Sequence, residues 1–188
     1  MVYRAEFCNI NSKFDESIPH IDINQFTNNH TLCEKVAIYK EDQLSLILNV
    51  YTEVDKDGFL FEQCFKEILI GEQKVAILHG RHVHLFDIKT NCTVSLFLND
   101  YAGHLYSVPD VHSTALSNNF LVTSFAYTFF VNIHTGIIWK SPRCAIDGVI
   151  INDIRDNIIY GSGEWDPPGG WRDFSLSLRD GSFIASDS

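Results

Sequence analysis

Residues 161 to 171, GSGEWDPPGGW, hold the residues of this chain that are best suited to chemistry. Glu164 and Asp166 flank Trp165, and Trp171 closes the segment. Two carboxylates can act as a general acid and a general base, but a glycosidase holds them several ångströms apart across its substrate. Positions two apart in one loop do not predict that geometry. An aromatic ring between carboxylates is more typical of a protein-binding hot spot that contacts a basic partner.

Two other interpretations of this segment stay open. Trp165 and Trp171 can fold back and cover the end of a hydrophobic core, or they can stack on a sugar or another small ligand. We expect the Pro167-Pro168 pair to hold the loop extended and the glycines to permit its sharp entry and exit. Long loops on rigid scaffolds often carry function, which favours a contact site.

A second acidic segment, EVDKDGFLFEQC, runs from Glu53 to Cys64. Asp55, Asp57 and Gly58 match part of a calcium-binding EF-hand loop, but Glu53 replaces the usual first Asp and Cys64 stands where the bidentate Glu belongs. Calcium binding is therefore not expected. The sequence instead predicts a hairpin turn at Asp57-Gly58 and an acidic rim formed by the carboxylates of Glu53, Asp55 and Asp57.

The histidine and cysteine patterns do not predict a metal site. His82 and His84 would share one face of a strand, but His79 lies across the preceding turn and gives no evident third ligand. The five cysteines are widely spaced and form no CxxC pair, so we expect reduced, mostly buried thiols. No glycine-rich phosphate loop or nucleophile motif is present. We therefore predict no metal, no cofactor and no enzymatic activity.

The elements that position these residues follow a repeat. The segments HLFDIKTNC (84–92), FFVNIHTGI (129–137) and FSLSLRDGS (174–182) each alternate apolar and polar residues and end in a turn signal. Their turn residues Asn91, Gly136 and Gly181 recur at about 45 residues, the period of a β-propeller blade. Such alternation closed by Asn or Gly is a hairpin signature.

Each repeat contains four short predicted antiparallel strands, including HSTALS (112–117) and SFIAS (182–186). We expect an all-β fold of one domain over 1–188, with blade-like units that form a small or incomplete β-propeller or an open β-sandwich. The predicted units are a weak first unit at about 35–62 and three clearer units at about 65–98, 112–141 and 148–186. The loop of the unit at 148–186 is about eight residues longer than its counterpart, and the excess lies within GSGEWDPPGGW.

Charge and size indicate the class of partner. The chain has 14 basic and 24 acidic residues among 188, a net charge of −10, so a phosphate backbone would repel it and direct nucleic-acid binding is disfavoured. This field would attract and steer a basic protein. With neither an apolar run long enough for a bilayer nor a secretory signal, we expect a cytoplasmic protein that binds no membrane.

In size, acidity and blade-like β units with a loop such as GSGEWDPPGGW, the chain resembles the immunity proteins of bacterial contact-dependent growth inhibition and related polymorphic toxin systems. The resemblance implies a cognate basic toxin, often a nuclease, that is neutralised in a stoichiometric complex. It carries no diagnostic motif. The expected partner-binding residues come from the two acidic segments: Glu164, Trp165, Asp166, Trp171 and Asp173, together with Glu53, Asp55 and Asp57. The alternative is a carbohydrate-binding or small-ligand-binding module, or an enzyme, that uses the Trp165/Trp171 loop. The Trp165-Asp166 pair does not recur, so it does not identify a WD40 protein.

Overall fold

A computed structural model of the chain describes residues 2–27, 29–60 and 65–185. All regular elements in these ranges are β-strands, fifteen in number, which confirms the predicted all-β class. The described residues include no helix of the length and hydrophobicity needed to cross a membrane.

The strands form four sheets, which follow one another along the chain. The first sheet contains β1 (Tyr3–Cys8), β3 (His30–Lys40), β4 (Gln43–Glu53) and β2 (His20–Ile23), in that order. The second contains β5 (Lys66–Ile70), β6 (Lys74–His79), β7 (His82–Asp87) and β8 (Cys92–Phe97). The third contains β9 (Ala102–Ser107), β10 (Asn119–Ser124), β11 (Thr128–Asn132) and β12 (Gly136–Lys140). The fourth contains β13 (Val149–Arg155), β14 (Ile158–Glu164) and β15 (Trp171–Ser177).

The turn residues that defined the repeat adopt the predicted left-handed backbone. The φ angles are 57° at Asn91, 87° at Gly136 and 72° at Gly181. Asn and Gly tolerate this conformation, and it allows the tight reversal of the chain after β7, β11 and β15, the third strands of the last three sheets. The predicted repeat of antiparallel hairpins is confirmed at these turns.

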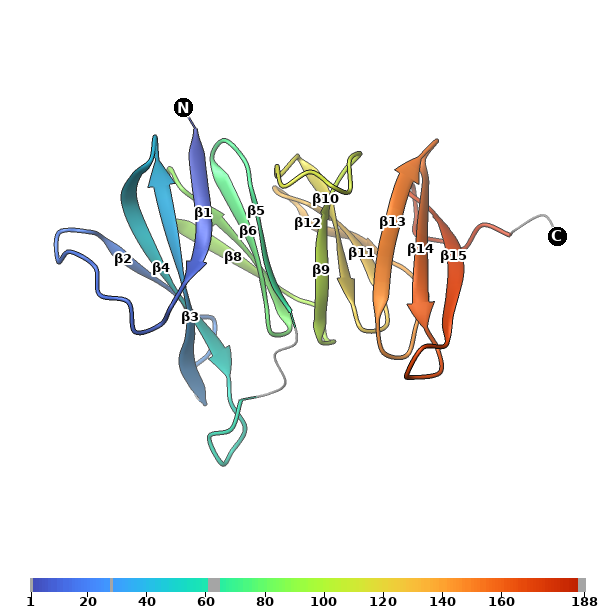
Figure 1. The fold of residues 1–188 in the computed structure, drawn as a ribbon, viewed down its shortest axis with the longest axis horizontal. Helices are drawn as coiled ribbons and strands as arrows, with labels where there is room; N and C mark the ends of the chain where they lie inside the picture. Colours follow the sequence, from blue (N-terminus) through green and yellow to red (C-terminus); the bar gives the residue numbers. More distant parts are fainter. Residues whose placement is uncertain (1, 28, 61–64, 186–188) are drawn as a thin grey trace.

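The four sheets stand side by side in a row (Figure 1). Neighbouring sheets pack against each other through apolar side chains. Three separate hydrophobic clusters fill the three interfaces, centred on Phe86 between the first and second sheets, Phe120 between the second and third, and Leu176 between the third and fourth. The first strand of each sheet forms a common inner wall, because β5 contacts β1 and β9, and β9 contacts β13. The row is therefore an open series of blade-like sheets.

Two predicted strands differ from the observed ones. The third sheet begins with β9 at Ala102, whereas the predicted strand at 112–117 forms only an isolated bridge from Ala115 to Ile70. The sequence analysis did not predict β9, because Gly103 and His104 interrupt the alternation of apolar and polar residues in AGHLYS. In the fourth sheet, the predicted fourth strand at 182–186 is reduced, over the described residues 182–185, to a bridge between Leu176 and Phe183, and residue 186 lies outside the described residues.

The first sheet is larger than the weak unit predicted at 35–62. It adds β1 and β2, which precede that range, and β2 pairs with β4 in parallel. A parallel pair joins residues that are distant in sequence and leaves no hairpin signature. A tight turn joins β3 and β4, with φ angles of 48° at Glu41 and 64° at Asp42.

Candidate partner-binding site

The GSGEWDPPGGW segment forms the end of the β14–β15 hairpin. Its first residues, up to Glu164, belong to β14, and Trp171 begins β15 directly opposite Glu164. The loop proper is therefore only 165–170. The Trp165 N–H donates to the Gly170 carbonyl at 2.9 Å, and the Gly170 N–H donates to the Asp166 carbonyl at 3.0 Å. The loop is a compact turn, so the expectation of an extended segment was wrong.

The Glu164 carboxylate stabilises this turn. It accepts a hydrogen bond from the Gly169 N–H at 2.6 Å. The Glu164 backbone fixes the preceding loop of the chain, because its carbonyl accepts from the Ile146 N–H at 2.8 Å and its N–H donates to the Gly148 carbonyl at 2.9 Å. Residues 146–148 therefore lie against the hairpin end, which brings Asp147 beside Glu164.

The two loop tryptophans contribute to different cavities. Trp171, 42% exposed, lines a cavity of about 220 Å³ together with Glu164. Trp165 is half-buried and lines a separate cavity of about 650 Å³ with Tyr160 and Phe174. The two rings therefore line separate cavities, so a sugar or small ligand in either cavity would meet one of the two tryptophans.

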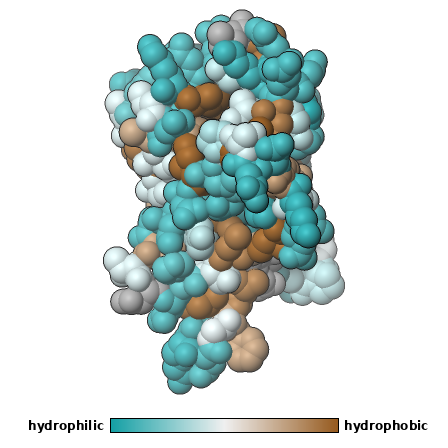
Figure 2. Space-filling model, turned by 90° about the vertical axis from the view of Figure 1, so that its left-hand side faces the viewer, coloured by the Kyte–Doolittle hydropathy of each residue, from teal (hydrophilic) through white to brown (hydrophobic). Residues whose placement is uncertain are grey.

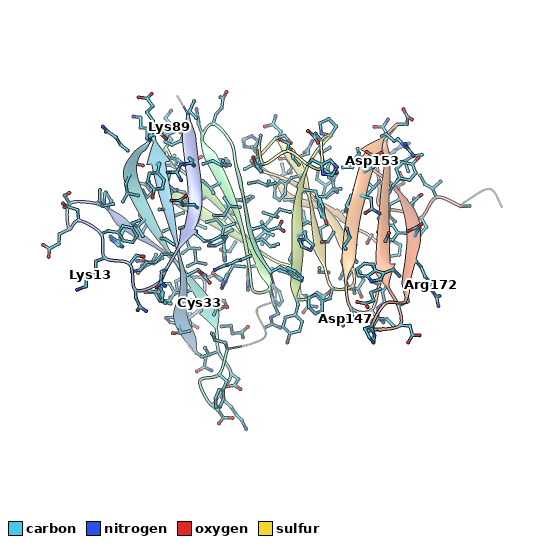
Figure 3. All side chains as sticks on the ribbon, in the orientation of Figure 1. Lys13, Cys33, Lys89, Asp147, Asp153 and Arg172 are labelled. Carbon is cyan, nitrogen blue, oxygen red and sulfur yellow. The ribbon has the colours of Figure 1, made fainter. Side chains whose placement is uncertain are left out.

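The smaller cavity combines aromatic rings with carboxylates. Its lining includes Trp171, Phe65 and Phe125, together with the acidic residues Glu164 and Asp147. Figure 3 shows Asp147 at the lower edge of the molecule, near the end of the β14–β15 hairpin. We call this the Trp171 cavity. Aromatic faces and carboxylates both attract cations, so the cavity has the chemistry to hold a basic side chain.

A hydrogen-bonded pair from two inner strands borders the Trp171 cavity. His104 Nδ1 on β9 lies 2.6 Å from Glu67 Oε1 on β5, and Glu67 Oε2 accepts from the Leu105 N–H at 2.6 Å. The Phe65 ring lies 4.6 Å from the His104 ring, centroid to centroid. These contacts connect the second and third sheets at the cavity wall and hold His104 in place.

Asp173 lines the large cavity that Trp165 also lines. Its carboxylate accepts a hydrogen bond from Ser162 Oγ at 2.7 Å, and Arg172 lines the same large cavity. Asp166 is exposed at the tip of the turn. The structure therefore places the five predicted residues of this segment on one hairpin, but not in one site. Glu164 and Trp171 line the Trp171 cavity, Trp165 and Asp173 line the large cavity, and Asp166 lies at the exposed tip.

The other predicted acidic group lies at the opposite end of the molecule, in the turn that follows β4 (Figure 1). Glu53 forms an ion pair with Arg81, and Asp55 accepts hydrogen bonds from the Asp57 and Phe59 N–H groups, both at 2.9 Å. The predicted turn at Asp57-Gly58 is confirmed, since Gly58 has a φ of 83°. Two of the three carboxylates therefore support local structure.

Hydrophilic residues cover most of the end of the molecule formed by the first sheet (Figure 2). Hydrophobic residues appear there as separate patches, and the turn after β4 projects downward as a largely hydrophilic tip. The structure does not bring this tip together with the hairpin that carries Trp171, so the two predicted acidic groups do not form one surface.

The histidine cluster faces the first sheet. His79 pairs with His82 in the β6–β7 register, and the His82 and His84 rings stack with centroids 5.8 Å apart. His84 Nδ1 lies 2.8 Å from Ser95 Oγ. Burial lowers the pKa of His82 to about 4 and that of His84 to about 3, so both imidazoles are neutral at physiological pH.

Sequence reasoning missed the residues that complete the Trp171 cavity. Asp147, Phe65 and His104 come from three separate parts of the chain, and none belongs to a recognisable motif. The only local signal was Asp147-Gly148, an acidic residue in a turn directly before a predicted strand.

No protein-family profile matches the chain, and no curated protein matches it. Among solved structures, the chain resembles the Pan2 WD40 domain of Neurospora crassa with 9% sequence identity and a TM-score of 0.47. The matched region covers 80% of this chain and 45% of that chain, so this chain spans less than half the length of that protein.

Proposed function

We propose that this chain is a non-enzymatic binding protein that masks a basic surface of a partner protein. The observation that supports this proposal is the Trp171 cavity, in which an exposed indole lies beside Glu164 and Asp147. Its volume of about 220 Å³ suits one long side chain of the partner. An arginine side chain fits best, because its guanidinium stacks on aromatic rings and bonds carboxylates with two parallel N–H groups.

The charge of the whole chain supports the same class of partner. A net charge of −10 accelerates the encounter with a basic protein, whereas the cavity supplies the specific contact at the centre of the interface. Electrostatic steering raises the association rate, and desolvated aromatic and charged anchors slow dissociation. The two features have different roles, so they can be tested separately.

The finer form of the proposal is an immunity protein that neutralises a toxin, most simply a nuclease with a basic active-site cleft. Its support is the resemblance in size, acidity and blade-like units, together with an anchor cavity for a basic side chain. Such a cleft presents clustered Arg and Lys side chains that would otherwise contact phosphates. An acidic protein that binds these side chains blocks the nucleic acid by occupying the same charges.

Binding of a fluorescein-labelled oligoarginine peptide, measured by fluorescence anisotropy, tests the anchor cavity. We expect Trp171→Ala and Asp147→Asn each to weaken binding about tenfold, since a desolvated cation–π contact or charged hydrogen bond is worth about 1 to 2 kcal/mol. Asp57→Asn is the matched control, because it removes the same charge at the distant tip. Equal losses in Asp57→Asn and Asp147→Asn would show that only net charge matters and would refute the cavity as the anchor.

Co-expression with a candidate basic nuclease domain tests the immunity function. We expect the chain to restore growth of cells that express the nuclease, through a 1:1 complex whose association slows by orders of magnitude from low to physiological salt. The double variant Trp165→Ala/Asp166→Ala and the single variant Trp171→Ala map the contact to one side of the hairpin. Continued nuclease activity in a complete complex would contradict active-site blockade.

The large cavity favours one second candidate, the binding of a sugar or similar small ligand. Its aromatic lining of Trp165, Tyr160 and Phe174 is accompanied by the polar side chains of Asn152 and Arg172. Aromatic rings beside hydrogen-bonding groups form typical small-molecule sites. Titration with a panel of oligosaccharides at low and high salt separates the two candidates, because sugar stacking changes little with salt.

A further inference from the structure

A group of metal-ligating side chains lies between the first and second sheets. The Cys33 thiol and the Glu34 carboxylate on β3 meet the His79 imidazole on β6, and the three ligand atoms all lie within 4.8 Å of one another. Figure 3 shows Cys33 in the lower half of the first sheet. This group is far from the β14–β15 hairpin and takes no part in the proposed partner binding.

A bulge in β3 explains how two consecutive residues reach one point. In a regular strand, Cys33 and Glu34 would face opposite sides of the sheet. The β3–β4 register shifts between Leu32 and Glu34, so that Cys33 is the extra residue. Bulges turn a side chain away from its regular direction and often lie beside functional sites. The distortion thus directs the thiol and the carboxylate toward β6 together.

His79 has the properties of a metal ligand that is ready to bind. It is only 3% exposed and follows Val75 and Ile77 on the face of β6 that packs against the first sheet. Among the residues that the structure describes, no hydrogen bond engages its ring nitrogens. Burial lowers its pKa to about 4, so the imidazole is neutral at pH 7 and offers a lone pair.

Lys66 orients the carboxylate of the group. Its ammonium nitrogen lies 2.8 Å from Glu34 Oε1, while the Glu34 side chain is only 19% exposed. Residues that bond a ligating carboxylate in this way commonly fix its orientation toward a metal ion. Burial raises the pKa of the Cys33 thiol, so the thiol is protonated without a metal and would lose its proton on binding one.

We propose that Cys33, Glu34 and His79 form a site for a borderline-soft divalent cation, with Zn²⁺ as the best fit. Sulfur, nitrogen and oxygen donors together match zinc, whereas calcium and magnesium prefer oxygen donors alone. Three protein ligands leave a fourth position, which a cavity of about 450 Å³ lined by Cys33, Glu34 and Lys66 makes accessible. The bound ion would cross-link β3 and β6, and hence the first two sheets.

Titration of the full chain with Co²⁺ followed by absorption tests this site. Tetrahedral Co²⁺ with a thiolate ligand gives visible d–d bands and a near-ultraviolet charge-transfer band. We expect saturation at one ion per chain and displacement by Zn²⁺, with release of about one thiol proton to the solvent. Cys33→Ser should abolish the charge-transfer band. His79→Gln and Glu34→Gln should weaken binding at least tenfold.

Cys92→Ser is the matched control, because it removes an exposed thiol from β8 and should leave the spectrum unchanged. A readout without mutation covers the case in which Cys33→Ser fails to fold. Zn²⁺ should protect Cys33, but not Cys92, from alkylation by iodoacetamide in the unmutated chain, as measured by mass spectrometry of the peptides. Alkylation of Cys33 at the same rate with and without Zn²⁺, or an unchanged cobalt spectrum in folded Cys33→Ser, would overturn the proposal.

Discussion

At the scale of single residues, Gly163 fixes the close approach between β14 and the loop before β13. A Cβ atom built on Gly163 would lie 2.0 Å from the carbonyl oxygen of Cys144. Both the strand and the loop are backbone at this contact, so neither can move aside cheaply. The glycine therefore allows residues 146–148 to reach the hairpin and position Asp147.

Gly163→Ala should destabilise the protein by several kcal/mol, because a backbone clash must be relieved by moving a strand. Gly58→Ala serves as the comparison: nothing lies within 4 Å of the place that its new methyl group would take, and its φ of 83° costs only about 1 to 2 kcal/mol. Urea unfolding of both variants measures the difference. Equal losses would mean that the contact with Cys144 has no special role.

The stability of the fold should fall as the pH decreases from about 6.5 toward 3. The pKa of His84 is about 3 in the folded chain, well below its unfolded value, so the unfolded state binds the proton first. The contribution of His84 is complete above its unfolded pKa and is lost by up to about 1.4 kcal/mol per pH unit below it. Urea unfolding at a series of pH values in this range gives the free energy of unfolding as a function of pH. This free energy should fall less steeply with decreasing pH in His84→Gln than in the exposed control variant His112→Gln.

Residue types predicted the turns well and the binding cavity poorly. Asn91, Gly136 and Gly181 have the predicted backbone because their requirement is local, a left-handed φ that few residues adopt. Asp147 and Phe65 could not be predicted in the same way. Their proximity depends on the packing of three sheets, and a single sequence contains no signal for contacts between distant segments.

At the scale of elements, the β14–β15 hairpin supplies Trp171 to the Trp171 cavity and Trp165 to the large cavity. The sequence located the hairpin correctly, but overestimated its loop, since period-2 alternation is interrupted by the glycines of β14. The same reason explains the missed β9, in which Gly103 faces Thr123 at close range. Glycines that permit close packing inside a strand look like turn residues in a sequence.

Replacing residues 165–170 by Asn-Gly should leave the hairpin intact. Glu164 and Trp171 are already paired, so a two-residue turn can close the two strands. We expect the free energy of unfolding to change by about 1 kcal/mol or less, while oligoarginine binding at the Trp171 cavity persists and any sugar binding that requires Trp165 is lost. Urea unfolding and the two binding assays check this result; unfolding of the variant would show that the turn is structural.

At the scale of the whole molecule, four sheets share three interfaces and no common centre. The clusters around Phe86, Phe120 and Leu176 lie between successive pairs of sheets. Arrays of this kind have stabilities that approximate sums over units and their nearest neighbours. A substitution that destabilises the last sheet should therefore lower the local stability of each further sheet along the row by a smaller amount.

Hydrogen exchange in variants tests this graded stability. Leu176→Ala removes a fully buried side chain from the last interface and should cost about 2 to 5 kcal/mol. We expect faster amide exchange in β13 to β15, a smaller change in β10 and β11, and little change in β3 and β4 below the limit of global unfolding. A uniform increase across all four sheets would indicate one cooperative unit.

The reduced last sheet has a mechanical consequence. The first and last strands, β1 and β15, belong to the sheets at opposite ends of the row (Figure 1). Among the described residues, β15 has β14 as its only full strand partner, with a single bridge at Phe183 on its other side. Tension applied to the two ends would load the sheets in series and peel β15 from β14 one hydrogen bond at a time. Trp171 would be pulled away together with β15. The Trp171 cavity would therefore lose its bound partner at a lower force than is needed to unfold the first three sheets.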